Sequence, residues 1–393
     1  MRTKSNIAIV YDGLNQVTSG AEVSTLRFSE LLSKRGYKVI IISSKNNEQK
    51  GIELYKGIKV YRLAPGLMIP KTEKKLVLSL ANSGKIKKIL SKEKINIVHF
   101  MWPTPLGLSA VRAAKKLNLK VVAHSHAQLE NIEPFLPKFM QKDSVLKFAY
   151  KYIVWCYNKA DFIVCPSKFA ENLLKKAHVK TKTVVISNGV DFSKFKKIKV
   201  SERDIKKFGM LKNSKKIIFV GRLDPEKNIS LLIKAVPEIE KKFSNFEVGI
   251  VGKGTLRQDL ENLSNKIGAA NKVRFLGKLS DEDLIKAYNL ADIFVLPSLC
   301  ELEGMAVLEA MACGKPVLVS NAKNSASKYL VNKNGFLFNP RSAKDLAIKC
   351  LKLLKNQKLL NKMANASFKE SRKYDINKSV SKLESLYYSL LNK

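Results

Sequence analysis

Two glutamates with a glycine between them form the pattern with the clearest chemistry in this sequence. Glu301 and Glu309 are separated by seven residues, and Gly304 lies between them. The surrounding run, Leu296–Pro316, predicts the end of a strand, a short loop and a helix closed by Gly314. A carboxylate accepts two hydrogen bonds from a vicinal diol. One acid in the loop and one in the helix therefore suit a ligand with two diols, such as a nucleotide sugar.

The start of this predicted helix offers further ligand-binding groups. If Gly304 opens the helix, the backbone amides from Gly304 through Met305 to Ala306 have no acceptor inside it. Amides at a helix N-terminus bind phosphate or hydroxyl oxygens. A strand followed by a loop and a helix N-terminus is also where open α/β sheets bind ligands.

Short apolar segments alternate with longer helical patterns along the whole chain. The first series of predicted strands is Ile7–Val10, Val39–Ile42, Ile97–Phe100, Val121–Ala123, Phe162–Cys165 and Val184–Ile186. The second is Ile217–Val220, Val248–Val251, Val273–Leu276, Ile293–Leu296 and Val317–Val319. Nearly continuous apolar strands between helices predict doubly wound parallel sheets, and two series predict two Rossmann-like domains.

The domain boundary is expected in the polar stretch between Asn188 and about Asn213. We assign residues 1–190 to the first domain and 191–369 to the second, with a cleft between them. A C-terminal helix of about 370–393 carries apolar residues at helical spacing and can pack back on the first domain. The pattern leaves open which domain it contacts; the apolar positions are Val380, Leu383, Leu386 and Leu390.

Composition and charge narrow the functional class. The 393 residues are 45% hydrophobic and 27% charged, which is typical of a globular protein. The net charge of +39 favours anionic partners such as phosphates, membranes or nucleic acid. Five cysteines without CxxC spacing indicate small buried residues in a reducing compartment. We find no signal-peptide core or spanning segment, so we expect a cytoplasmic protein.

The glutamate pattern, together with the following Glu-Ala-Met-Ala-Cys-Gly-Lys-Pro, resembles the signature of retaining glycosyltransferases with the GT-B fold, of the family 4 type (glycosyl transferases group 1). The resemblance extends along nearly the whole chain. It implies a metal-independent hexosyltransferase that uses a UDP-sugar as donor and no other cofactor. It also implies front-face attack without a protein nucleophile, with Glu301 at the reaction centre.

The resemblance assigns roles to two further regions. Arg222 and Lys227, in the run after the first strand of the second domain, match the pair that grips the donor diphosphate. Fixed cations suit the charge that develops as a nucleotide diphosphate departs. Gly20 matches a glycine of a loop that approaches the reaction centre. The alternative for Arg222 and Lys227 is a pair of solvated charges at a helix start.

The segment after the fourth strand of the first domain carries two histidines. By the same resemblance His126 is the active-site histidine beside the transferred sugar, and His124 is the fallback. The alternative is a neutral histidine hydrogen-bonded in the cleft wall. His99, inside a strand, is expected to be structural. Asn131 after Gln128 and Glu130 resembles the diacylglycerol glucosyltransferase branch, which implies a membrane lipid as acceptor.

One position departs from the family pattern. Leu302 and Glu303 stand where many relatives have Gly and Phe, so an extra acid is expected beside the sugar pocket. The donor sugar is therefore open between glucose, which we prefer, galactose and mannose.

Two segments predict contact with an anionic membrane on the inner face of the cell. Residues 71–94 contain eight Lys and two Glu among apolar residues, and residues 134–159 combine aromatic residues with further lysines. The alternative is a pair of ordinary helices whose lysines are solvated. A soluble or polysaccharide acceptor stays open as the rival substrate.

The sequence allows four other interpretations. Asp281 and Asp283 fit the acid-x-acid pattern of metal-dependent transferases, but they follow Ser280 at a predicted helix start, so we interpret them as capping residues and expect no metal. Gly252-Lys-Gly254 lacks the third glycine of a dinucleotide fingerprint and predicts a tight turn. A basic nucleic-acid-binding protein would explain the charge, but no such signature is present, and we expect no nucleic acid. Sugar-nucleotide epimerases and phosphorylases share the predicted architecture.

Overall fold

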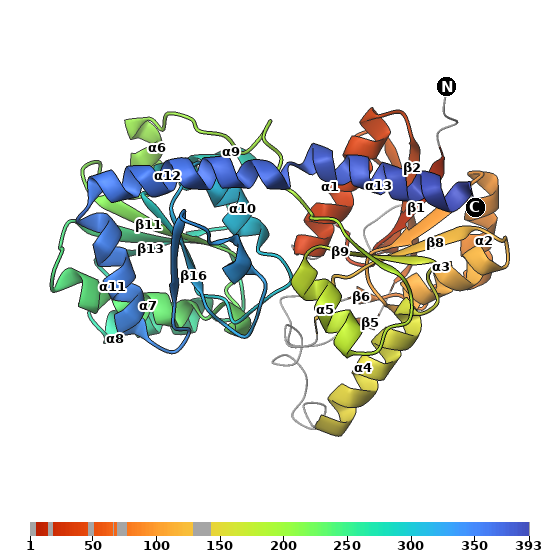
Figure 1. Ribbon diagram of the computed structural model, residues 1–393, viewed down its shortest axis with the longest axis horizontal. Coiled ribbons are helices and arrows are strands. Elements are labelled where there is room, and N and C mark those ends of the chain that lie inside the picture. Colours follow the sequence, from red (N-terminus) through yellow and green to blue (C-terminus); the bar gives the residue numbers. More distant parts are fainter. Residues whose placement is uncertain are drawn as a thin grey trace. The chain divides into compact units, whose positions relative to one another are not determined.

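The structure is a computed structural model that describes residues 5–14, 19–45, 51–65, 67–68, 77–128 and 143–392. It divides into two compact units, drawn in Figure 1: Met1–Asn188 with Asn377–Lys393, and Gly189–Ile376. The C-terminal helix α13 (Ile376–Leu391) thus belongs to the first unit, which answers the question that the sequence left open. Its four predicted apolar residues are buried.

Among the described residues, the first unit has an eight-stranded sheet in the order β10-β9-β8-β7-β1-β2-β4-β3 and a separate pair of short strands. The strands are β1 (Asn6–Val10), β2 (Lys38–Lys45), β3 (Ile52–Tyr55), β4 (Ile58–Pro65), β7 (Ile97–Phe100), β8 (Lys120–His124), β9 (Phe162–Cys165) and β10 (Thr183–Val185), with β5 (Leu67–Met68) and β6 (Val77–Leu78) as the pair. The helices, besides α13, are α1 (Gly20–Lys34), α2 (Ser83–Lys92), α3 (Pro105–Lys115), α4 (Asp143–Tyr157) and α5 (Lys168–Lys176).

The edge of this sheet differs from the prediction of a wholly parallel sheet. Strands β3 and β4 were not predicted, and β3 runs antiparallel to β4. The turn between them consists of Lys56 and Gly57, whose φ angles are 47° and 81°. Two successive positive φ values are what a tight two-residue hairpin requires. The sequence did not predict this turn, because such turns usually carry Asn-Gly or Asp-Gly, and here the first position is a lysine.

The second unit has a six-stranded parallel sheet in the order β13-β12-β11-β14-β16-β18. Its strands are β11 (Lys215–Val220), β12 (Phe246–Val251), β13 (Val273–Gly277), β14 (Ile293–Leu296), β16 (Val317–Ser320) and β18 (Gly335–Phe338), with the short pair β15 (Cys300–Glu301) and β17 (Asn324–Ser325). The helices are α6 (Glu202–Lys207), α7 (Ile229–Glu240), α8 (Arg257–Lys266), α9 (Asp281–Leu290), α10 (Met305–Ala312), α11 (Ala343–Leu354) and α12 (Gln357–Ser371), with 3-10 turns η4 (Pro225–Lys227), η5 (Ser327–Leu330) and η6 (Arg372–Tyr374).

Both sheets have a point where the strand order changes direction. In the first unit β1 lies between β2 and β7, and in the second unit β11 lies between β12 and β14. The connections that follow the two strands on either side of this point run to opposite faces of the sheet. The loops after these strands therefore diverge at the carboxyl ends. Ligands of open α/β sheets bind at this place, at the carboxyl ends of the strands.

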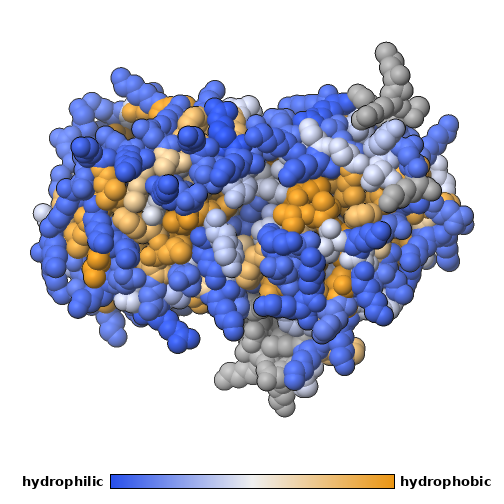
Figure 2. Space-filling model, in the orientation of Figure 1, coloured by the Kyte–Doolittle hydropathy of each residue, from blue (hydrophilic) through white to orange (hydrophobic). Residues whose placement is uncertain are grey.

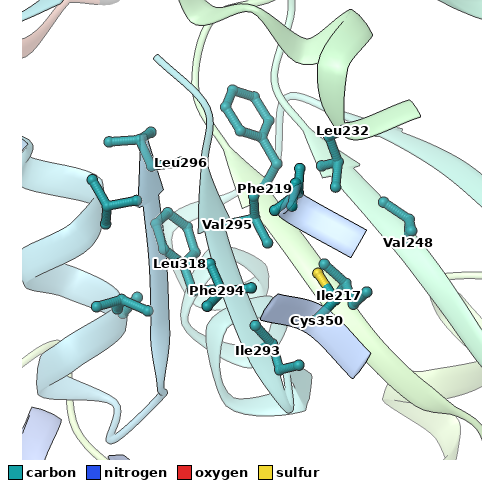
Figure 3. Packing of buried hydrophobic residues seen from close by; sticks show 14 of the residues in the cluster. Ile217, Phe219, Leu232, Val248, Ile293, Phe294, Val295, Leu296, Leu318 and Cys350 are labelled. Atoms are coloured by element: carbon teal, nitrogen blue, oxygen red, sulfur yellow. The ribbon is translucent and has the colours of Figure 1, made fainter. Parts of the chain in front are cut away.

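Buried side chains pack around the central strands of the second unit (Figure 3). Phe219 of β11, Phe294 of β14 and Leu318 of β16 are fully buried in one cluster. Cys350 lies in the same cluster, and all five cysteines are buried free thiols, so the prediction of small apolar residues is confirmed. A close-packed core of this kind keeps the loops at the strand ends in defined places.

Hydrophilic side chains cover most of the face of the molecule in Figure 2. Over the described part of the chain, no helix combines the length and the apolar character needed to cross a membrane.

Candidate functional site in the second unit

The loop after β11 carries Arg222, which two buried acids hold in place. The guanidinium forms an ion pair with Asp224 and a second one, at 2.5 Å, between Nη2 and Oε1 of Glu226. Asp224 and Glu226 are 2% and 3% exposed. Burial raises the pKa of Glu226, and Arg222 and then Lys227 oppose this rise. The two acids fix the guanidinium and also compete with any anionic ligand for it.

Two glycines after β12 brace this loop from behind. A side chain at Gly252 would place its Cβ 1.8 Å from the carbonyl oxygen of Gly221, and one at Gly254 would place its Cβ 2.5 Å from backbone atoms of Leu223. The backbone N–H of Leu223 donates to the carbonyl of Lys253 at 2.9 Å. The tight turn predicted for Gly252-Lys-Gly254 is present, and its function is to let the two loops touch.

Lys227 and Glu301 meet across the switch point of the sheet. Lys227 ends the η4 turn after β11, and Glu301 ends β15 after β14. Nζ of Lys227 lies 2.6 Å from Oε1 of Glu301, and the two side chains are 12% and 17% exposed. The backbone of Glu301 is tethered as well, because its carbonyl accepts a hydrogen bond from Ala326 at 2.8 Å. A predicted phosphate-binding cation and a predicted sugar-binding acid are therefore neighbours.

Gly304 opens helix α10, as predicted, and it is the N-cap residue with a φ of 104°. A Cβ at this position would lie 2.8 Å from Cβ of Ser327, so both conformation and space favour glycine. Met305 and Ala306 form the first turn of the helix. Their amides belong to the group that an α-helix leaves without intrahelical acceptors, which suits an anionic or hydroxyl ligand.

Glu309 lies one turn further along α10 and is 8% exposed. Its Oε2 accepts a hydrogen bond from the hydroxyl of Tyr288, at 2.9 Å, and Tyr288 is fully buried in α9. This bond orients the carboxylate. The contribution of Tyr288 was not predicted, because an aromatic residue in a helix carries no local signal of such a contact. Asp224 and Glu226 were also missed, although acids between Arg222 and Lys227 were a visible sign.

Glu303 does not stand among the exposed groups of this loop. It is 5% exposed, and its charge contributes to a raised pKa of Tyr374, for which burial is the larger cause.

Ser280 caps α9 by accepting from the amide of Asp283, and Asp281 lies in the same first turn. Asp283 pairs with Lys207 at 2.7 Å and Asp281 with Lys194 at 2.5 Å. Both acids therefore lie in the first turn of α9, as predicted, while Ser280 is the residue that caps the helix.

The remaining predicted residues lie in the first unit. Gly20 is the first residue of α1, where Ser19 caps the helix, so it stands at a helix N-terminus and not inside a loop as predicted. Asp12, just after β1, was missed; burial raises its pKa to about 7, and the Thr104 hydroxyl offsets part of the rise. An acid directly after an apolar central strand was the signal that could have identified it.

His126 follows β8 at the carboxyl edge of the same sheet. Burial lowers the pKa of His126 to about 3, so the ring is neutral at pH 7. It stacks on His124 with ring centroids 4.3 Å apart. His99 is fully buried in β7, in agreement with the structural role predicted for it. Gln128 is also buried, whereas Glu130 and Asn131 lie outside the described residues.

Comparison with known families covers both units. Residues 18–194 match Glycosyltransferase Family 4, and residues 200–370 match Glycosyl transferases group 1. The chain belongs to this glycosyltransferase family. The Arg222 loop and the Glu301–Glu309 segment both fall in the second match, and His126 and Gly20 fall in the first.

Two curated relatives illustrate the range of the family. The alpha-monoglucosyldiacylglycerol synthase of Streptococcus pneumoniae is 24% identical over 76% of this chain and 67% of its own length. The UDP-Gal:alpha-D-GlcNAc-diphosphoundecaprenol alpha-1,3-galactosyltransferase of Escherichia coli is 28% identical over 99% of this chain and 98% of its own. Their names differ in both the sugar and the acceptor.

Solved structures of similar proteins show which fold this chain has. The Anabaena protein HepE in complex with UDP-glucose superposes with a TM-score of 0.77 at 18% identity, over 98% of this chain and all of that one. The chain therefore has the GT-B fold with two Rossmann-like domains, as predicted.

Proposed function

We propose that this glycosyltransferase moves a hexose, with glucose preferred, from a UDP-sugar to a membrane lipid such as 1,2-diacylglycerol, with retention at the anomeric carbon. The observation that carries the proposal is the grouping of four side chains at the carboxyl edge of one sheet: Arg222, Lys227, Glu301 and Glu309. Arg222 and Lys227 follow β11, and Glu301 and Glu309 follow β14, so the two neighbouring strands bring the pairs together, and Lys227 contacts Glu301 directly.

Each group has a separate task on the donor. Arg222 and Lys227 bind the diphosphate and stabilise the charge that develops on it as the glycosidic bond breaks. Glu301 accepts hydrogen bonds from hydroxyls of the sugar, and Glu309, oriented by Tyr288, accepts them from the ribose. The amides of Met305 and Ala306 donate to the sugar or phosphate oxygens.

Catalysis then rests on charge stabilisation. The leaving phosphate takes the proton of the acceptor hydroxyl on the face from which it departs, so no side chain has to act as a nucleophile. Fixed cations supply the stabilisation of the leaving group without a metal ion. Gly20 and His126, in the first unit, are assigned to the neighbourhood of the transferred sugar, where the neutral imidazole of His126 offers one donor and one acceptor.

One face of helix α4 (Asp143–Tyr157) exposes aromatic residues, which is a reason to propose a membrane lipid as the acceptor. Phe148 and Trp155 are 73% and 43% exposed, seven residues apart and so on one side of the helix. Tyr152 packs near Trp155, and Nζ of Lys159 lies 5.1 Å from the Trp155 ring centroid. Exposed aromatics beside lysines are typical of helices that lie in the interface of an anionic membrane.

The other predicted membrane segment contributes charge. Helix α2 exposes Lys85, Lys87, Lys88 and Lys92; residues 71–76 and 134–142 of the two predicted segments lie outside the described residues. Clustered lysines at a surface attract anionic lipids. We accordingly place the enzyme in the cytoplasm, peripheral on the inner face of the cell membrane.

The test compares donors and location together. Labelled UDP-glucose, UDP-galactose and GDP-mannose are each incubated with the protein and a lipid extract, and the label in the organic phase is counted. We expect transfer from UDP-glucose, and transfer only from GDP-mannose would refute the assignment of the donor. Flotation with anionic vesicles distinguishes a lipid acceptor from a soluble one. An enzyme for a soluble or polysaccharide acceptor works without lipid and stays in the bottom fraction of the gradient.

A further inference from the structure

Three of the four histidines of the chain form one continuous stack inside the first unit. The rings of His99 and His124 lie 5.4 Å apart at 8°, and those of His124 and His126 lie 4.3 Å apart at 16°. His99 and His124 are 1% and 0% exposed. The fourth histidine, His178, lies outside the stack, in the turn after α5.

The sheet itself creates this alignment. His99 of β7 pairs in register with Val122 of β8. Because alternate residues of a strand point to the same face, His124 and then His126 follow Val122 on the side of His99. The stack therefore runs from the interior of the sheet to its carboxyl edge, where His126 stands.

The inner end of the stack is attached to the C-terminal helix. The hydroxyl of Tyr387, in α13, lies 2.7 Å from Nδ1 of His99, and Tyr387 is fully buried. Helix α13 is itself fixed to the body of the unit by Arg35, whose Nη1 lies 2.5 Å from Glu384 and 2.9 Å from the Ser381 hydroxyl. Helix α13, which carries Tyr387, therefore cannot shift away from the unit without loss of these contacts.

The buried histidines of this stack lower the stability of the fold relative to apolar residues, so their presence suggests a function. Two fully buried imidazoles carry polar nitrogens into the core, where Phe or Leu of similar size would need no hydrogen-bond partners. Among the described residues, Nε2 of His99 has no hydrogen-bond partner. A polar ring retained in a core at such a cost indicates a requirement for its orientation or tautomer.

We propose that Tyr387, His99 and His124 are positioning residues that hold the ring of His126 in one orientation through the ring stack. The C-terminal helix thereby acts on the carboxyl edge of the sheet through four rings in contact. This inference rests on the proposed function for the role of His126, but the coupling itself does not depend on any substrate.

The experiment uses the full-length protein with ¹⁵N-labelled histidine. Tyr387→Phe removes one hydroxyl and keeps the ring, so it leaves the packing in place. Tyr388→Phe is the matched control, since Tyr388 is the next residue of the same helix and is 48% exposed. The ring nitrogen signals of His126, assigned by comparison with His126→Gln, report changes in the surroundings of its ring, and His178 serves as the reference.

We expect Tyr387→Phe to shift the ring nitrogen signals of His99 and also those of His126, and to lower kcat roughly three- to tenfold, the range of one hydrogen bond, with the KM for the donor unchanged. Tyr388→Phe should do neither. The inference is overturned if the His126 signals and kcat stay as in the wild type. If no donor supports transfer by the wild type, the proposed function fails, and the nitrogen signals alone then decide the coupling.

Discussion

Replacement of Gly254 by alanine tests how the second unit places Arg222. The new Cβ would lie 2.5 Å from the N, C and O atoms of Leu223, the residue after Arg222. These are backbone atoms on a loop fixed by the Leu223–Lys253 hydrogen bond, so no side chain can rotate away. Overpacking of this kind costs about 1–3 kcal/mol of folding free energy. The loop must shift, and Arg222 shifts with it.

The expected loss of ligand binding follows from that shift. A hydrogen bond to a charged group contributes about 1.5–3 kcal/mol, so UDP should bind roughly ten- to a hundredfold more weakly to Gly254→Ala. Isothermal titration with UDP measures the affinity, and urea denaturation followed by circular dichroism measures the stability.

Gly268→Ala is the matched control for the conformational effect. Gly268 has a φ of 71°, and a Cβ there would meet no atom within 4 Å. Alanine should cost about 1–2 kcal/mol of stability through its left-handed conformation, with UDP affinity unchanged. If Gly254→Ala binds UDP as tightly as the wild type, or if Gly268→Ala weakens binding as much, the bracing role assigned to Gly254 is wrong.

Three further outcomes are expected. Tyr288→Phe leaves Glu309 without its 2.9 Å donor and should weaken UDP binding about three- to tenfold by titration, with a smaller effect on a diphosphate without ribose; equal losses on both would speak against a ribose contact. The raised pKa of Asp12, about 7, means that the folded protein binds a proton there that the unfolded chain has lost, so between about pH 4 and 7 stability falls by about 1.4 kcal/mol per pH unit as pH rises. Asp12→Asn should abolish this component, making the variant relatively more stable at pH 8 than at pH 5 in urea unfolding; parallel curves would refute it. Phe148→Ser with Trp155→Ser should reduce flotation with anionic vesicles and leave UDP affinity intact, and undiminished flotation would remove α4 from the membrane contact.

The parts of the fold that were predictable are those encoded locally. Continuous apolar runs gave the central strands of both sheets, and the helix stop at Gly314 gave the end of α10. The hairpin of β3 and β4 was not predictable in this way, because Lys56 adopts a left-handed conformation that glycine or asparagine usually takes. The length of the loop between β2 and α2 was the only sign of extra strands.

The parts of the site that were predictable are the residues that lie at a characteristic spacing in one segment of the sequence. Glu301, Gly304 and Glu309 lie in one segment, so their order alone indicated a ligand site. The contacts that orient them join distant positions: Tyr288 reaches Glu309, and Gly254 supports the loop of Arg222. No local pattern encodes such pairs, because they depend on which strands become neighbours in the sheet.

The central claim is that the carboxyl edge of the second unit holds a nucleotide sugar for transfer to lipid. The most direct measurement follows the sugar of labelled UDP-glucose into 1,2-diacylglycerol in anionic vesicles, for the wild type and for Glu301→Gln, which keeps the size of the side chain and removes the charge paired with Lys227. We predict labelled glycolipid from the wild type and a loss of about a hundredfold in the variant, because a hydrogen bond to a charged group contributes about 1.5–3 kcal/mol and Glu301 accepts such bonds from the transferred sugar. Labelled glycolipid formed at equal rates by both proteins would contradict the account.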